Sequence, residues 1–108
     1  MITIRFEKQK NQIQLIIKGH AEFDVYGKDL VCGAVSSIVI GGLNNLQDVS
    51  DNYDIKIEKG YVEVNSKKNT IVSEHDSIVF ETILVQLKTI EAKFPKNVKI
   101  EIKEYLWN

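Results

Sequence analysis

The sequence predicts an α+β fold of two layers in the order β-β-α-β-β-α-β, with one mixed sheet and two helices packed mainly on one of its faces. Two patterns support this prediction: several short segments alternate apolar and polar residues, and two longer segments show helical spacing. The 108 residues fit one domain, spanning residues 1–108, which is long enough to bury a core without disulfides or metals. Amphipathic strands with only two helices should leave the second face of the sheet open for dimer contacts.

Five segments have the alternation of half-buried strands: residues 2–7, 13–18, 54–58, 61–65 and 98–103. The first two are joined by a short polar connection, so we expect them to form an antiparallel hairpin. The third and fourth flank Lys59-Gly60 and predict a second hairpin with a tight turn.

The first helix is expected from Leu30 to about Leu46, although this segment is rich in valine and isoleucine, which favour strands. About 17 residues are too many for one strand, and small residues recur at helical spacing. Asp29 is placed to act as the N-cap, because its carboxylate can accept hydrogen bonds from the first-turn amides. Small residues near the start, such as Gly33, predict close packing there.

The second helix opens at Ser73, and Asp76 three positions later resembles the second member of a capping box. Pro95 ends this helix. Apolar residues then follow one face of the helix at steps of three or four: Val79, Ile83, Leu87, Ile90 and Phe94, with Phe80 and Leu84 widening the stripe.

Charge and hydropathy exclude several classes of partner. The net charge is −1, from 14 basic and 15 acidic residues, so we predict no direct nucleic-acid binding. No apolar run approaches the roughly 18 residues that span a bilayer, so no membrane partner is predicted. One cysteine cannot form an internal disulfide, and residues 1–6 lack the pattern of a secretory leader, which together predict a cytoplasmic protein. Histidines 20 and 75 with Cys32 match no common zinc pattern, and we expect neither a metal nor another cofactor.

The stretch of residues 19–36 holds the reactive groups: the only cysteine, Cys32, and one of the two histidines, His20. If the helix begins near Leu30, Cys32 lies in its first turn, where unpaired amides and the helix dipole favour a thiolate. His20, at the end of a strand, could reach the same point and move a proton, and the first-turn amides could stabilise an oxyanion. These are the parts of thiol-based acyl transfer. The residues alone leave open the alternative that Cys32 is a small buried hydrophobe.

Two neighbouring residues have open roles. Asp29 is a helix cap and could also serve as a general base. Ser36, one turn after Cys32, either forms a hydrogen bond within the site or is a small packing residue.

Residues 19–21 (Gly-His-Ala) and 27–36 (Gly-Lys-Asp-Leu-Val-Cys-Gly-Ala-Val-Ser) resemble the motif of the ribosomal-processing cysteine protease (Prp) family. That motif is Gly-His-Ala, a variable loop, and Gly-x-Asp-(Ile/Leu)-Val-Cys-Ala-Ala-Val-Ser. Length and element order agree over essentially the whole chain, whereas the specific part is confined to residues 19–36. Gly33 departs from the motif, where alanine is common, but remains small.

The resemblance implies a Cys-His endopeptidase, with Cys32 as the nucleophile and His20 as the general base and acid. Asp29 and Ser36 match further motif positions with supporting roles. The implied substrate is the N-terminal extension of a large-subunit ribosomal protein, and members of the family resemble homodimers.

The resemblance also implies that the loop between the two motifs is mobile and gates the site. Its apolar side chains lie before a glycine and could cover a thiolate or contact an extended peptide. We expect the loop to be fully ordered only when substrate is bound. The expected gating residues are Ala21, Phe23, Val25, Tyr26 and Gly27.

Two other functions are alternatives to the endopeptidase. One is a non-catalytic module that binds a ribosomal protein during ribosome assembly, and the other is a redox or acyl-carrier thiol. The reactivity of Cys32 separates the catalytic function from the binding module, because a catalytic thiol should alkylate rapidly near neutral pH, at a rate that depends on His20.

Overall fold

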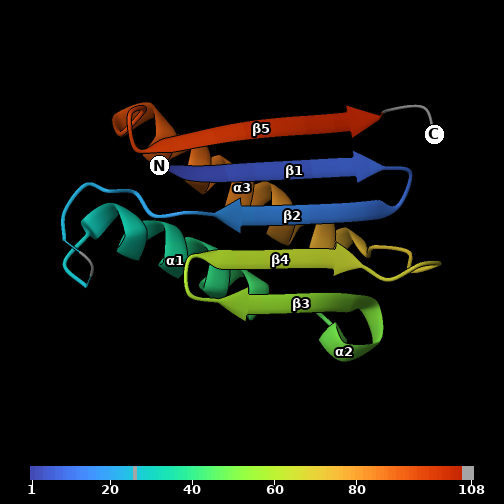
Figure 1. Ribbon diagram of the computed structural model, residues 1–108. Helices are drawn as coiled ribbons and strands as arrows, with labels where there is room; N and C mark the ends of the chain where they lie inside the picture. Colours follow the sequence, from blue (N-terminus) through green and yellow to red (C-terminus); the bar gives the residue numbers. More distant parts are fainter. Residues whose placement is uncertain (26, 106–108) are drawn as a thin grey trace.

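The computed structural model describes residues 1–25 and 27–105, and its core is one five-stranded mixed sheet in the order β3-β4-β2-β1-β5 (Figure 1). The predicted α+β fold is confirmed. β1 pairs with β5 in parallel, and the other neighbouring strands are antiparallel. The elements are β1 (Ile2–Gln9), β2 (Gln12–Lys18), α1 (Leu30–Leu43), α2 (Val49–Asn52), β3 (Tyr53–Glu58), β4 (Tyr61–Ser66), α3 (Glu74–Lys93) and β5 (Val98–Tyr105).

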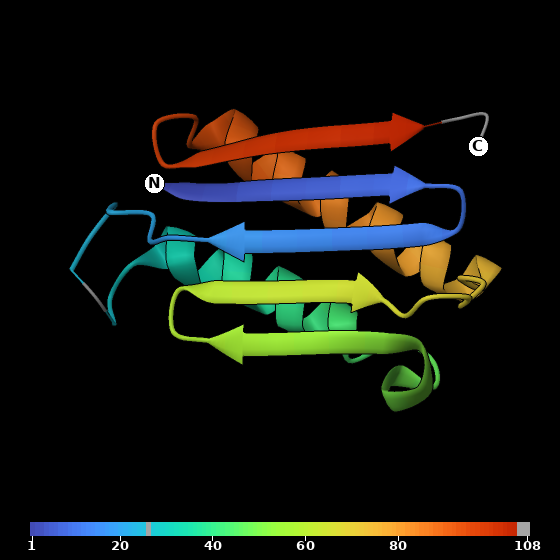
Figure 2. The ribbon, with the colours of Figure 1, turned by 45° about the vertical axis from the view of Figure 1, so that its right-hand side comes forward.

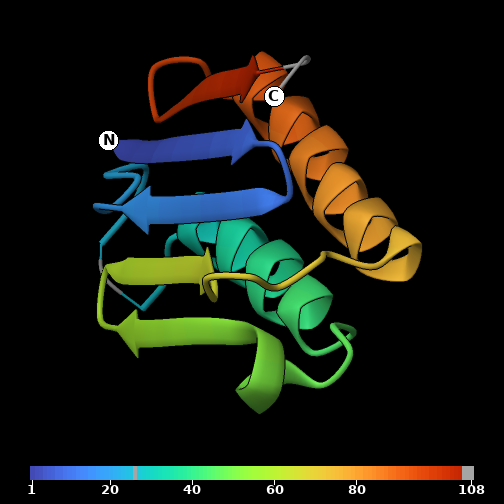
Figure 3. The ribbon, with the colours of Figure 1, turned by 90° about the vertical axis from the view of Figure 1, so that its right-hand side faces the viewer.

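Both long helices cover the same face of the sheet, which leaves two layers (Figure 3). In Figures 1 and 2, α3 lies behind the β5 side of the sheet and α1 behind the β4 side. Alternate side chains of each strand face the helices and form the core, as the period of two predicts. On β1 and β2 these core residues are Ile2, Ile4, Phe6, Ile13, Leu15 and Ile17.

Helix α1 begins at Leu30 as predicted but ends at Leu43 rather than near Leu46. The expected close packing near Gly33 is wrong, because a Cβ added there would meet nothing within 4 Å. The close approach is instead near the C-terminal end of α1, at Gly42, where a Cβ would collide with the side chain of Ile83 on α3. Small residues therefore matter where α1 crosses α3 rather than where α1 begins.

Helix α3 is capped by Ser73, whose Oγ accepts a hydrogen bond from the Asp76 backbone N–H at 3.1 Å. The return half of a capping box is missing, because the Asp76 carboxylate turns inward. It accepts from the Tyr53 hydroxyl at 2.7 Å and from the Gln47 backbone N–H at 3.1 Å, and Asp76 is only 1% exposed. Asp76 thus connects α3 to β3 and to the segment before α2. The one-turn helix α2 was not predicted from the sequence.

One end of the sheet gathers the start of β1, the end of β2, the β3–β4 turn and the start of β5 (Figure 1). Gly19 follows β2 at this end, and its backbone N–H donates to the Gly60 carbonyl at 2.9 Å. Its φ is +102°, and a Cβ there would collide with the Met1 carbonyl oxygen, so only glycine fits. This glycine fixes where the chain leaves the sheet and therefore where His20 is placed.

The sheet face away from the helices carries mainly polar side chains at the alternate positions. Gln14 Nε2 donates to Asn65 Oδ1 at 2.8 Å, and Glu63 accepts from Asn65 and from the Tyr61 hydroxyl.

The homodimer and the cytoplasmic location expected from the sequence stay predictions. Within residues 1–25 and 27–105, no helix combines the length and the apolar character needed to cross a membrane.

Candidate active site

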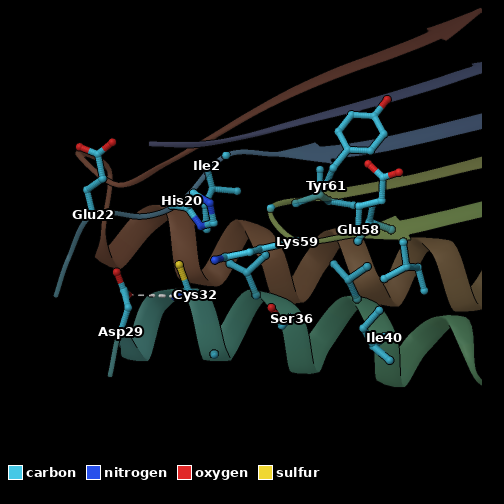
Figure 4. A pocket seen from close by; sticks show the side chains of 18 of the residues that line it. Ile2, His20, Glu22, Asp29, Cys32, Ser36, Ile40, Glu58, Lys59 and Tyr61 are labelled. Atoms are coloured by element: carbon cyan, nitrogen blue, oxygen red, sulfur yellow. Dashed lines mark hydrogen bonds between the residues drawn. The ribbon is translucent and has the colours of Figure 1, made fainter. Parts of the chain in front are cut away.

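A pocket of about 770 Å³ lies between α1 and the β3–β4 hairpin, and the loop after β2 closes one end of it (Figure 4). Aliphatic side chains form much of its wall: Ile2, Ile17, Val35, Val39, Ile40 and Ile57. Polar groups gather near the loop, where His20, Asp29 and Cys32 all line the same pocket. The structure therefore brings together three residues that the sequence singled out. His20 comes from the segment after β2, Asp29 is the N-cap of α1, and Cys32 lies in the first turn of α1.

Cys32 occupies the first turn of α1, as predicted, and its side chain is half-buried at the pocket wall. Its Sγ accepts a hydrogen bond from the Ala21 backbone N–H at 3.2 Å. A sulfur that lines a pocket and has a backbone donor differs from a small hydrophobe closed in the core. The sulfur therefore has a backbone N–H partner and an open side towards the pocket.

His20 is exposed, and its imidazole points from the segment after β2 towards the end of the pocket where Cys32 lies (Figure 4). Its imidazole packs against the β3–β4 turn, since a Cβ added at Gly60 would lie 2.8 Å from His20 Nε2 and 3.0 Å from Cε1. Gly60 has a φ of +70°, so both its backbone conformation and its neighbour require glycine. The second hairpin thus forms the support for the histidine, a role that its sequence pattern alone did not indicate.

Both carboxylate oxygens of Asp29 are occupied by backbone donors. Oδ1 accepts from Val31 at 2.9 Å and Cys32 at 3.0 Å, and Oδ2 accepts from Phe23 at 2.9 Å and Asp24 at 3.1 Å. Burial alone would raise the pKa of Asp29, but these four hydrogen bonds outweigh it and the pKa lies below the ordinary value. The predicted cap is confirmed, and the same carboxylate also holds the loop.

Asp29 leaves little of the first turn for an oxyanion. The backbone N–H groups of Val31 and Cys32 donate to its side chain, and that of Gly33 donates to its carbonyl at 3.0 Å. The expectation that these first-turn amides stabilise an oxyanion is therefore wrong for these three groups.

The loop residues expected to gate the site have different environments. Ala21 is 1% exposed and belongs to the core, whereas Val25 is 63% exposed. The Phe23 ring packs edge-on against Phe94 with centroids 5.3 Å apart. Gly27 lines the pocket, and Tyr26 lies outside the described residues. Gating stays a prediction.

Two further polar residues line the pocket. Ser36 is exposed and lies one turn beyond Cys32, facing the pocket. Lys59, which sequence reasoning treated only as part of a turn, extends its ammonium group toward the region of His20 and Cys32 (Figure 4). No local pattern could identify Lys59, because only the folding of the hairpin over α1 brings it to the pocket.

No cluster of three or more His, Cys, Asp or Glu side chains suited to a metal ion occurs among residues 1–25 and 27–105. The lack of a metal or other cofactor in the mechanism stays a prediction from the sequence.

Comparisons with known proteins show which family the chain resembles. The model of the family described as cysteine protease Prp matches residues 1–99. The ribosomal processing cysteine protease Prp of Mycoplasma genitalium is 32% identical over 91 residues, covering 84% of this chain and 89% of that protein. The protein of the same name from Bacillus subtilis is 29% identical over 103 residues, covering 91% and 92%.

The fold also matches solved structures. A crystal structure of an essential ribosomal processing protease Prp from S. aureus, in complex with a covalently linked product peptide, has a TM-score of 0.82. It is 26% identical and the match covers 95% of this chain and all of that one. A second structure of the S. aureus protease, in complex with a substrate peptide, has a TM-score of 0.76 at 25% identity. By its match to the family model over residues 1–99, the chain belongs to the cysteine protease Prp family.

Proposed function

We propose that this chain is a cysteine endopeptidase in which Cys32 is the nucleophile and His20 the general base and acid. The observation that carries the proposal is the position of the Cys32 sulfur: in the first turn of α1, beside a backbone N–H donor, in a pocket that His20 also lines. A thiolate is the reactive form of cysteine, and a nearby imidazole supplies the proton that the leaving amine needs.

The proposed reaction has two halves. His20 accepts the thiol proton, and Sγ attacks the peptide carbonyl to form a tetrahedral intermediate. The C–N bond then breaks as His20 returns the proton to the leaving amine, which leaves a thioester on Cys32. A water molecule, deprotonated by His20, hydrolyses this thioester and frees the enzyme. The S. aureus relative with a covalently linked product peptide supports chemistry through a covalent bond to the protein.

The substrate we infer is the N-terminal extension of a large-subunit ribosomal protein. The names of the relatives, ribosomal processing cysteine protease, and the S. aureus complex with a substrate peptide support a peptide from a ribosomal protein. The pocket adds a constraint: with Ile17, Val39 and Ile57 in its wall, it suits apolar side chains near the scissile bond.

Asp29 and Ser36 support this reaction without touching the bond that breaks. Asp29 holds the start of α1 and the loop in one arrangement, so that Cys32 and Ala21 keep their relative positions. Ser36 faces the pocket one turn from Cys32 and is available to bind the substrate.

Thiol reactivity tests the proposal directly. The rate of Cys32 alkylation by iodoacetamide near neutral pH should exceed that of a free cysteine peptide and fall when His20 is replaced by alanine. The matched control is His75→Ala, since His75 is exposed on α3 and its ring nitrogen lies 2.9 Å from the Asn45 carbonyl. A thiol that reacts only after unfolding would contradict the proposal and favour a module that binds a ribosomal protein without chemistry.

A further inference from the structure

Asn97 lies between α3 and β5, far from the motif stretch in sequence, yet its side chain reaches the loop beside the pocket. Its Nδ2 donates to the Ala21 carbonyl oxygen at 2.9 Å across 76 residues of sequence. A carbonyl oxygen only accepts hydrogen bonds, so the amide nitrogen of Asn97 must be the atom that faces it.

The backbone of Asn97 is itself fixed. Its carbonyl accepts from the Ile2 N–H at 2.8 Å, and its N–H donates to the Phe94 carbonyl at 3.0 Å. The first bond joins Asn97 to the start of β1, and the second joins it to the end of α3. Asn97 is thus a fixed point of the scaffold from which its side chain holds the loop.

The residue that Asn97 holds also contacts the sulfur. The Ala21 N–H donates to Cys32 Sγ at 3.2 Å, and the Ala21 side chain is 1% exposed in the core. A hydrogen bond to an anion is stronger than one to a neutral group, so this donor favours the thiolate over the thiol. The strength of the effect depends on how firmly the donor is held toward sulfur.

We propose that Asn97 is a positioning residue for the Cys32 thiolate: it holds Ala21 through its carbonyl and so keeps the Ala21 N–H directed at the sulfur. The inference rests on the proposed function, in which Cys32 is the nucleophile. Asn97 touches neither substrate nor sulfur, and its effect passes entirely through Ala21.

Other contacts keep the loop attached when Asn97 is changed. Asp29 Oδ2 binds the N–H groups of Phe23 and Asp24, and the Phe23 ring packs on Phe94. Loss of the Asn97 side chain therefore loosens the Ala21 N–H that donates to sulfur rather than the whole loop.

The test is the pH dependence of Cys32 alkylation by iodoacetamide in the full chain. Asn97→Leu keeps a similar side-chain size but has no donor, and Asn97→Ser is too short to reach Ala21 and serves if the leucine variant does not fold. Either variant should move the midpoint of the alkylation curve up by about half a pH unit or more. The control is Tyr53→Phe, which removes the hydrogen bond from Tyr53, at the start of β3, to Asp76. This variant should lower the melting temperature without moving the midpoint of the alkylation curve.

The outcomes separate the inference from the proposed function. An unshifted midpoint in both Asn97 variants, or an equal shift in Tyr53→Phe, would overturn the role of Asn97 while Cys32 could still be the nucleophile. An unchanged alkylation rate in His20→Ala, or wild-type alkylation no faster than that of a free peptide, would instead overturn the proposed function.

Discussion

Asp29 Oδ1 accepts a hydrogen bond from the backbone N–H of Cys32 at 3.0 Å, so one carboxylate orients the turn that carries the sulfur. Its other oxygen accepts from Phe23 and Asp24 in the loop that precedes it. The residue that begins the helix therefore also folds the loop back onto it, which places the Ala21 N–H against Sγ. The Asp29 carboxylate therefore both caps α1 and holds the loop of the candidate active site, so a change at Asp29 should affect both.

Replacing Asp29 by asparagine should lower both the melting temperature and the cleavage rate. An amide has one accepting oxygen, so its NH₂ group would face either the loop amides or the helix amides, which are all donors. Thermal unfolding and peptide cleavage measure the two effects. Asp48→Asn is the control, because Asp48 begins α2 without a side-chain hydrogen bond to it and should be nearly neutral. An Asp29→Asn protein as stable and as active as wild type would contradict this account of the cap.

The pH dependence of stability should also depend on Asp29. Its pKa in the folded chain lies below the ordinary 3.8, so the ionised carboxylate stabilises the fold above that pH. This contribution is lost as the pH falls below 3.8 toward the lowered pKa. The difference in melting temperature between wild type and Asp29→Asn should accordingly be larger at about pH 7 than at about pH 3. A difference that stays constant or grows on acidification would show that ionised Asp29 does not stabilise the fold.

Gly60→Ala should impair cleavage more than stability. The positive φ of Gly60 makes alanine cost about 1 kcal/mol, and the new methyl group would press on His20 Nε2, displacing the imidazole. A displaced general base should lower kcat/KM by about tenfold or more. Gly41→Ala is the control: a Cβ there meets nothing within 4 Å, and it lies inside α1, where alanine is the better helix former. Unchanged cleavage by Gly60→Ala would remove the support for His20 as a positioned base.

Tyr53→Phe should destabilise the chain by about 1–3 kcal/mol without lowering its activity. The change leaves one oxygen of the 1%-exposed Asp76 carboxylate without its partner. The raised pKa of Tyr53, which burial and the bond to Asp76 cause, is a sign of the same contact. Urea unfolding gives the loss, and Tyr61→Phe, which removes a hydroxyl on the open face, should cost less. Equal losses in the two variants would contradict the importance of the buried contact.

The strands could be predicted because apolar and polar residues alternate with the two-residue period of a β-strand. Each of β1 to β5 begins within one residue of its predicted start. The end of α1 could not be predicted, because Leu46 is buried although it follows the helix. The chain makes a turn there, with the Leu46 N–H bonded to the Leu43 carbonyl, and the apolar pattern continues past the helix. The four residues of α2 are too few to produce a periodic pattern.

The site could be predicted only as far as it is local. His20, Asp29 and Cys32 lie within thirteen positions, and cap, strand end and helix start are readable from neighbouring residues. The donor from Ala21 to the sulfur is a backbone N–H, a group that every residue except proline has, so no sequence pattern reveals it. Lys59 and Asn97 reach the site from distant elements, and only the packing of the sheet brings them there.

The central claim is that Cys32 cuts a peptide bond in the N-terminal extension of a large-subunit ribosomal protein. The most direct measurement is mass spectrometry of a peptide that spans this extension and continues past its junction with the mature protein. The wild-type chain should convert the peptide into two fragments, and Cys32→Ala and His20→Ala should leave it intact while keeping the wild-type circular dichroism spectrum. Cleavage by Cys32→Ala at the wild-type rate, or an intact peptide after incubation with the folded wild-type chain, would contradict the account.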